Sequence, residues 1–263
     1  MKVAAVVADK GAEFSPIYRA DFEEAIARLS ELGYDGVEIS FLNPFDVEYN
    51  KIRQILEEYA LEPVALSTGL TYVNYGISLS DRDESRRKKA IERFMGYIDV
   101  AEAIGSDIVV LGLIRGKNRN NFELFKKSLK ECLKYAEKKK VTIALEPINR
   151  YETEMINKVE EAASLMEEME SEHLKIMADT FHMNIEERSI EETIRIFGKN
   201  FVHFHIADSN RYAPGYGHID FRVVIGALRE TGYDRALSAE ILADDVENSL
   251  KQTIKHIRLI LYG

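Results

Sequence analysis

The sequence predicts an α/β protein, a single (β/α)8 TIM barrel that spans residues 1–263. Two observations support this fold. Eight short, β-branched apolar runs alternate with longer amphipathic stretches, and no Pro- or Gly-rich linker separates any pair of them. Eight units in 263 residues average about 33 residues each. A doubly wound parallel sheet is the alternative that the same alternation allows.

Eight segments have the length and composition of buried parallel strands. Each is rich in Val, Ile, Leu or Ala. The expected strands are residues 2–8, 36–40, 63–68, 107–113, 142–148, 174–180, 201–208 and 236–241.

A helix is expected after each strand. In the first of them Phe22, Ile26 and Leu29 fall on one face, and Gly33 follows as a stop signal. The expected helices are residues 20–32, 49–61, 83–105, 121–139, 158–170, 188–198, 220–231 and 245–261.

The composition is that of a globular protein with a heavily charged surface. Hydrophobic residues make up 46% of the chain, charged residues 30%, and the formal net charge is -10. A negative chain repels a phosphate backbone, so no nucleic-acid partner is expected. No apolar run approaches the roughly 20 residues of a membrane helix, and the opening lacks the features of a secretory signal. We therefore expect no membrane partner and a cytoplasmic location. One cysteine, Cys132, excludes an internal disulfide framework and a cysteine-based zinc cluster.

Four expected strands end on side chains that bind metals. In a barrel, chemistry belongs at the carboxyl ends of the strands. Glu146, Asp179, His205 and Glu240 occupy four consecutive ends, and they are 33, 26 and 35 residues apart, close to one unit each. Each shares a strand face with the residue two positions earlier, so all four would line half of the barrel mouth.

Three carboxylates and one imidazole form an oxygen-rich set. Such a set suits one divalent ion, Mn2+ in the first place and otherwise Mg2+ or Co2+. Each residue also has a simpler explanation. Glu146 precedes a proline as loop carboxylates do, Asp179 could cap a helix, and His205 could be a hydrogen-bonded core residue. The register of all four favours the metal site.

The strings around these residues resemble a known family. "LEPINRYET", "ADTFHMNIEE", "HFHIADSNRYAPGYGHIDF" and "SAEI" look like the xylose-isomerase-like barrels, and within them the D-tagatose/D-psicose 3-epimerase group. The resemblance implies one divalent metal held by the four residues above, with Glu146 and Glu240 also carrying protons as the catalytic pair. It further implies that Glu152, His182 and Arg211 bind substrate oxygens, and that the chain assembles as a dimer or tetramer.

These residue types suit epimerisation beside a ketone. Removal of the weakly acidic proton leaves an enediolate, whose charge must be stabilised where it develops. Inversion then needs a base on one face of the substrate and an acid on the other, which Glu146 and Glu240 could provide from different strands.

The substrate is expected to be a keto sugar or a keto acid. Arg115, after the fourth strand, could bind a substrate carboxylate through two hydrogen bonds. With this arginine the chain looks closest to the branch that converts 5-keto-L-gluconate to D-tagaturonate in inositol catabolism. Some ketose epimerases line the sugar pocket with tryptophans, whereas this chain has no Trp. A neutral ketose 3-epimerase and an aldose-ketose or hydroxypyruvate isomerase remain as alternatives.

Other interpretations have less support. Endonuclease IV shares the barrel but needs three zinc ions and more histidines than the six present. A non-catalytic sugar-binding barrel would not need both candidate bases. His203 lies one inward position below His205 and is expected to support it or to pack in the core. Asn149 and Arg150 could either buttress their loop or contact substrate.

Overall fold

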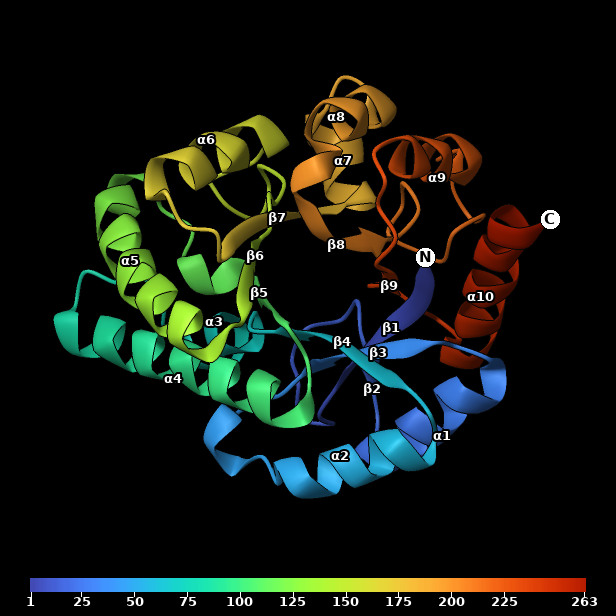
Figure 1. The fold of residues 1–263 in the computed structure, drawn as a ribbon, viewed down its shortest axis with the longest axis horizontal. Helices are drawn as coiled ribbons and strands as arrows, with labels where there is room; N and C mark the ends of the chain where they lie inside the picture. The colour runs from blue at the N-terminus through green and yellow to red at the C-terminus, as the bar shows by residue number, and fades with distance from the viewer.

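The computed structural model describes residues 1–263 as a closed parallel barrel inside a ring of helices (Figure 1). Eight strands follow one another around the barrel in chain order, and β1 pairs with β9 to close it. Closure confirms the (β/α)8 fold and excludes the doubly wound sheet, which stays open. The strands are β1 (Lys2–Ala8), β3 (Gly36–Ser40), β4 (Glu62–Ser67), β5 (Ile108–Leu111), β6 (Thr142–Leu145), β7 (Leu174–Asp179), β8 (Phe201–Ile206) and β9 (Ala236–Ala239). The two-residue β2 (Tyr18–Arg19) pairs with the end of β1.

All eight expected strands are present, but several end earlier than predicted. The fourth stops at Leu111, and Leu113–Arg115 form a short 3₁₀ helix instead. The fifth stops at Leu145, two residues before Pro147, which has no N–H to offer a neighbouring strand. The backbone N–H of Glu146 still donates to Leu111 O at 3.2 Å, so Glu146 stands at the rim of the barrel, directly after β6.

Eight helices form the outer ring, each close to its expected range. They are α1 (Phe22–Leu32), α2 (Tyr49–Glu58), α4 (Glu84–Ile104), α5 (Phe122–Lys139), α6 (Val159–Met169), α8 (Ile190–Phe197), α9 (Phe221–Glu230) and α10 (Val246–Tyr262). Helix α1 shows why they form where they do. Asp21 caps its N-terminus, Ile26 and Leu29 are buried, and Gly33 ends it with a left-handed φ of 85°.

Two short helices were not predicted, and both lie at the carboxyl ends of strands. They are α3 (Leu70–Tyr75) after β4 and α7 (Thr180–Glu186), which begins directly at the end of β7. Both are only about two turns long, too short for a clear amphipathic pattern. Further 3₁₀ turns are Pro44–Asp46, Arg119–Asn121 and Gly198–Asn200.

The main hydrophobic core lies between the barrel and the helix ring. A smaller cluster fills the barrel itself, formed by Ala65, Ile108, Val110, Ala144 and Met177. Ala144 and Met177 lie two residues before Glu146 and Asp179 on the same strand faces. Apolar side chains therefore lie beneath these two carboxylates.

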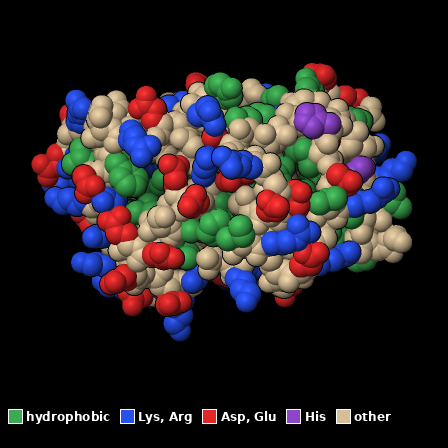
Figure 2. Space-filling view, turned by 90° about the horizontal axis from the view of Figure 1, so that it is seen from above, with side chains coloured by type: hydrophobic (Ala, Val, Ile, Leu, Met, Phe, Trp, Pro, Cys, Tyr) green, Lys and Arg blue, Asp and Glu red, His purple; other side chains and the backbone are tan.

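The surface carries mixed charge. Figure 2 shows acidic and basic side chains interspersed over one face, with hydrophobic side chains between them. No helix combines the length and apolar character that crossing a membrane requires.

Candidate active site

Glu146, Asp179, His205 and Glu240 meet at the carboxyl-terminal mouth of the barrel. Glu146 and Glu240 directly follow β6 and β9, Asp179 ends β7, and His205 is the penultimate residue of β8. Strand register explains their meeting, because Asp179 pairs with His205 and His205 pairs with Ser238, two residues before Glu240. One donor atom from each of the four lies within 4.8 Å of all the others, and all four side chains are buried.

The donor atoms are spaced as in a cation site, and two of them have no hydrogen-bond partner. Nδ1 of His205 lies 3.8 Å from Glu146 Oε1, 3.9 Å from Asp179 Oδ2 and 3.7 Å from Glu240 Oε2. Atoms bound at about 2.1 Å to one shared ion lie about 3 to 4.2 Å from one another. His205 Nδ1 and Asp179 Oδ2 are buried without any hydrogen-bond partner. These residues therefore fit one divalent cation, which would satisfy both atoms.

The raised carboxyl pKa values in the cluster also indicate a site for a positive ion. Burial raises the pKa of Glu146 to about 8; His205 opposes this shift, and the neighbouring Glu240 and Asp179 add to it. Burial likewise raises the pKa of Asp179 to about 6, against the effects of Arg211 and His205. A divalent cation would compensate carboxylates that otherwise resist ionising together.

The pKa of Glu240 is shifted in the opposite direction to that of Glu146. Burial acts to raise the pKa of Glu240, but the positive charges of His205 and Arg211 outweigh it, and the pKa is lowered. Arg211 Nη2 donates to Glu240 Oε2 at 2.5 Å. Two carboxyl groups with pKa values moved in opposite directions are a common basis for separate acid and base roles.

Glu38 is a residue of the site that sequence reasoning missed. It lies inside the barrel on β3, fully buried, and its Oε2 accepts hydrogen bonds from His205 Nε2 at 2.8 Å and His203 Nε2 at 2.7 Å. Its Oε1 accepts from Ser67 Oγ. Burial acts to raise the pKa of Glu38, but the two imidazoles lower it well below the ordinary range. His203 therefore supports His205 through a shared carboxylate.

Glu38 also orients His205 toward the ligand cluster. A carboxylate accepts hydrogen bonds, so Nε2 of His205 carries the proton and Nδ1 faces the other three donors. Although burial opposes it, the Glu38 and Glu240 carboxylates raise the pKa of His205 well above 6.5, so a cation bound at Nδ1 would replace a proton. The available signal in the sequence was an acidic residue in the middle of the apolar strand "GVEIS".

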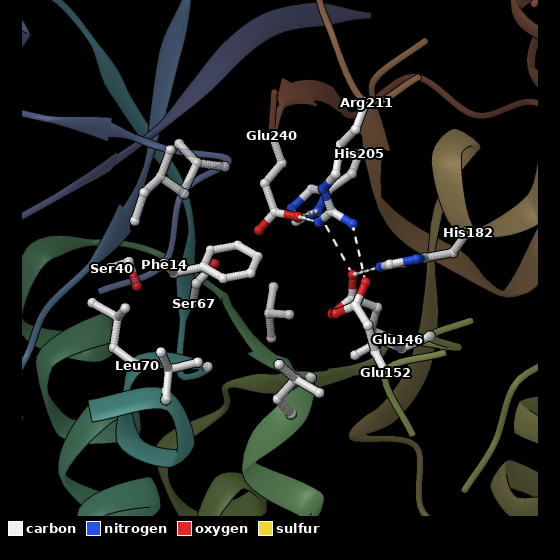
Figure 3. Close-up of a pocket in the computed structure, with 18 residues that line it drawn as sticks. Phe14, Ser40, Ser67, Leu70, Glu146, Glu152, His182, His205, Arg211 and Glu240 are labelled. Carbon is white, nitrogen blue, oxygen red and sulfur yellow. Dashed lines mark hydrogen bonds and ion pairs between the residues drawn. The ribbon is translucent and has the colours of Figure 1, made fainter. Parts of the chain in front are cut away.

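The three residues expected to bind substrate lie beside this cluster, as Figure 3 shows. His182 Nε2 points into the cavity and lies 3.8 Å from both Glu146 Oε1 and Asp179 Oδ2. Burial lowers the pKa of His182 well below 6.5, and the charges of Arg211 and His205 lower it further, so its ring is neutral. Arg211 Nη1 lies 3.4 Å from Glu152 Oε1, which places Glu152 at the edge of the same group.

Arg115 does not reach the cavity, and the expected contact with a substrate carboxylate is wrong for this structure. The side chain is fully buried, and its guanidinium donates to the backbone carbonyls of Leu111, Gly112, Met155 and Ile156. Burial lowers its pKa to about 10, against the charges of Glu146, Glu152 and Glu161. Arg115 therefore connects the loop after β5 to the loop after β6. Its guanidinium donates to these carbonyls and not to a group in the cavity.

The loop after β8 is organised by a second residue that the sequence did not reveal. Asp208, fully buried, accepts hydrogen bonds from the backbone N–H groups of Ser209, Gly215 and Ile219. A side chain at Gly217 would collide with Asp208 Oδ1, 2.2 Å from the position of its Cβ. Arg211, within this loop, holds a left-handed φ of 64°, a rare conformation for a residue with a side chain. The loop thus fixes the backbone that aims Arg211 at Glu240.

The mouth of the barrel holds a cavity with two unlike halves. Figure 3 shows the carboxylates, histidines and Arg211 on one side and Phe14, Leu70, Ser40 and Ser67 on the other. The labelled residues of the second side come from the first half of the chain. The hydrophobic residues that line the whole cavity are Val6, Phe14, Ile17, Leu70, Val73, Val110, Leu113 and, after β6, Ile148. Arg211 is the single Lys or Arg among the lining residues, and it is already paired with Glu240 and Glu152.

Comparison with known proteins agrees with this geometry. The family described as "Xylose isomerase-like TIM barrel" matches residues 26–260. A D-psicose 3-epimerase of Enterocloster bolteae is 33% identical over 84% of this chain and 77% of its own length. An L-ribulose 3-epimerase of Mesorhizobium japonicum is 30% identical over 89% of this chain and 81% of its own. The crystal structure of a 3-keto-D-glucoside 4-epimerase from E. coli, at 24% identity, superposes with a TM-score of 0.83 over 98% of this chain and 99% of its own. The chain belongs to the xylose isomerase-like TIM barrel family, and these relatives within it are carbohydrate epimerases.

Proposed function

We propose that this protein is a divalent-metal-dependent epimerase that inverts C3 of a neutral ketose. The family and its relatives support the wider class, a carbohydrate isomerase or epimerase. The observation that carries the proposal is the pair Glu146 and Glu240. Both are buried beside one cavity, yet they come from β6 and β9, with two strands between them. Figure 3 shows them reaching the same space from different sides, as inversion requires.

Glu146, Asp179, His205 and Glu240 would hold the cation, which supplies Lewis-acid stabilisation of negative charge on the substrate oxygens beside C3. Three oxygen donors and one nitrogen donor favour Mn2+, with Mg2+ or Co2+ as substitutes.

The proton steps fall to the two glutamates. One removes the proton at C3 from one face of the ketose, which leaves an enediolate, and the other returns a proton to C3 from the opposite face. The reverse reaction exchanges the two roles.

The neighbouring polar residues stabilise and orient the substrate. His182 is neutral and points Nε2 at the cluster, so it can donate a hydrogen bond to an enediolate oxygen. Arg211 brings positive charge to the same side and positions Glu240. Glu152 lies at the edge of the cavity, where its carboxylate can accept a hydrogen bond from a substrate hydroxyl.

The lining of the cavity favours a neutral substrate over a keto acid. A carboxylate at the far end of the sugar would face the hydrophobic half of the cavity. The one Lys or Arg that lines the cavity, Arg211, lies over the Phe14 ring and is already paired with Glu152 and Glu240. Arg115, the residue that suggested 5-keto-L-gluconate, is committed to backbone carbonyls. Ketoses such as psicose and ribulose, the substrates in the names of the two relatives, carry no charge.

The test follows the fate of the C3 proton. Protein loaded with Mn2+ or Mg2+ is incubated in deuterated water with psicose, fructose, tagatose, ribulose, 5-keto-L-gluconate and hydroxypyruvate, and the products are identified by NMR. Solvent deuterium at C3 with inverted configuration is expected, with a neutral ketose turning over fastest. Deuterium at C1 with an aldose product would instead establish an aldose-ketose isomerase.

A variant of Glu240 separates catalysis from simple sugar binding. E240Q keeps the shape of the side chain but removes its ability to carry a proton, so kcat should fall about 100-fold or more once metal loading has been verified. E24Q, at an exposed position on α1, is the control and should turn over like the wild type. Unchanged turnover in E240Q would overturn the assigned role.

A further inference from the structure

We propose that Asn149 is a positioning residue that holds the His182 ring in the tautomer with its proton on Nε2. His182 then presents an N–H donor, rather than a lone pair, to the reacting oxygens. The inference rests on the proposed epimerase function for the identity of the acceptor. The tautomer itself can be measured without any substrate.

The orientation of the Asn149 amide is fixed by two contacts that do not involve His182. Its Oδ1 accepts a hydrogen bond from the backbone N–H of Tyr151 at 3.0 Å. Its Nδ2 lies 2.9 Å from Oε1 of Glu152, a carboxylate oxygen that accepts. Turning the amide over would set an oxygen against the carboxylate and an NH2 group against an N–H. Both contacts therefore identify Nδ2 as the atom that faces His182.

This orientation decides the His182 tautomer. Nδ2 of Asn149 lies 2.8 Å from Nδ1 of His182, inside the protein. An NH2 group only donates, so Nδ1 must accept, and the single proton of the neutral ring is left on Nε2. Nε2 is the atom that points at Glu146 in the cavity (Figure 3), and it also lies 3.8 Å from Asp179 Oδ2. With the opposite tautomer, a lone pair would face the negative charge of the enediolate.

The loop around Asn149 is anchored independently of any ligand. The backbone N–H, Nε and Nη2 of Arg150 all donate to the carboxylate of Glu186 on α7, at 2.7, 2.9 and 2.7 Å. Helix α7 also carries His182, so this ion pair joins the loop of Asn149 to the helix of its histidine. Asn149 itself is only 2% exposed. The contact to His182 is thus built into the resting structure.

The experiment reads the ring nitrogens of His182 directly. Full-length protein with 15N-labelled histidine rings is loaded with Mg2+, which is diamagnetic, and examined by NMR, with the His182 signals assigned by their loss in H182N. In the wild type, Nδ1 should have the shift of an unprotonated nitrogen and Nε2 that of a protonated one. A protonated Nδ1 in the wild type would overturn the proposal.

Two substitutions of Asn149 test the cause. N149D has nearly the same shape but offers an acceptor, so it should draw a proton onto Nδ1 of His182. N149A removes the donor and should leave a mixture of tautomers. Each should lower kcat about tenfold or more, because the donor at the reacting oxygen is lost or weakened. A pure Nε2–H tautomer in both variants would show that another contact decides the tautomer and would overturn the proposal.

E152Q is the matched control. It alters the other partner of the Asn149 amide but leaves the contact between Asn149 and His182, so the wild-type tautomer should persist even though turnover changes. If the proton moved to Nδ1 in E152Q but stayed on Nε2 in both N149D and N149A, the effect would belong to Glu152 and the role of Asn149 would be overturned. If no ketose is epimerised, the proposed function fails, while the NMR result still decides what Asn149 does to His182.

Discussion

At the scale of single residues, Asp179 uses its two carboxylate oxygens for different tasks. Oδ1 accepts a hydrogen bond from the backbone N–H of Phe181 at 2.8 Å and caps α7, whereas Oδ2 has no hydrogen-bond partner and faces the ligand cluster. Helix capping and metal binding stood as alternatives in the sequence, and the geometry allows one side chain to serve both. The cap holds the carboxylate plane, so Oδ2 is aimed before any cation arrives.

Glu38 provides the first prediction at this scale. Replacing it by glutamine should weaken the affinity for Mn2+ about 10- to 100-fold, because the amide no longer offers a charged acceptor to His205 Nε2 and the imidazole is less firmly oriented. Isothermal titration calorimetry of the metal-free variant measures this directly. E24Q should bind like the wild type. Equal affinity in a correctly folded E38Q would mean that His205 is oriented without its carboxylate partner.

At the scale of secondary-structure elements, the residue at which each strand ends determines how the side chains of the site are placed. Strand β5 stops at Leu111, and Gly112 follows it directly beneath the carboxylate of Glu146. A Cβ at Gly112 would lie 2.6 Å from Glu146 Oε2. The end of β5 therefore leaves room for the carboxylate of Glu146, which directly follows the neighbouring strand β6.

We expect G112A to displace the Glu146 carboxylate and lower kcat about tenfold or more, since small misplacements of reacting groups are costly. G226A, in the middle of α9, is the matched control. A Cβ there meets no atom within 4 Å, so it should leave turnover unchanged and stabilise the helix slightly. Steady-state kinetics and thermal melts of both variants check this. Normal turnover in G112A would show that Glu146 can move aside without cost.

At the scale of the whole molecule, a cation would tie together four strands that close the second half of the barrel. Its ligands come from β7 and β8 and from the residues directly after β6 and β9. A ligand that binds only the folded state stabilises it by mass action, by about 2.7 kcal/mol at a concentration of 100 times Kd. Metal loading should therefore affect the stability of the fold as well as turnover.

Treatment with EDTA should lower the melting temperature, and added Mn2+ should restore it. The shift should be absent in D179N, which loses a charged ligand at the centre of the site. Differential scanning calorimetry at several metal concentrations provides the measurement. The prediction fails if Mn2+ raises the melting temperature of D179N as much as that of the wild type.

The sequence by itself determined the barrel, its eight units and the positions of the four candidate ligands. It could do so because these features follow from local patterns, namely the period of each apolar run and the residue at which that run ends. Glu146, Asp179, His205 and Glu240 could each be read from the end of one strand. The resemblance of the surrounding strings added Glu152, His182 and Arg211, which the structure places beside the ligand cluster.

Only the tertiary structure decided what these residues touch. Glu38 and His205 are 167 residues apart and meet only because the barrel closes. The sequence left Arg115 available to bind substrate, because two of its four carbonyl partners, Met155 and Ile156, lie about 40 residues away and come near it only in the folded chain. The hydrophobic lining of the cavity, which argues for a neutral substrate, likewise gathers residues from β1, from β5 and from the loops and short helices after several strands. Long-range contacts of this kind leave no period or spacing in the sequence, because the strand order and register of the closed barrel create them.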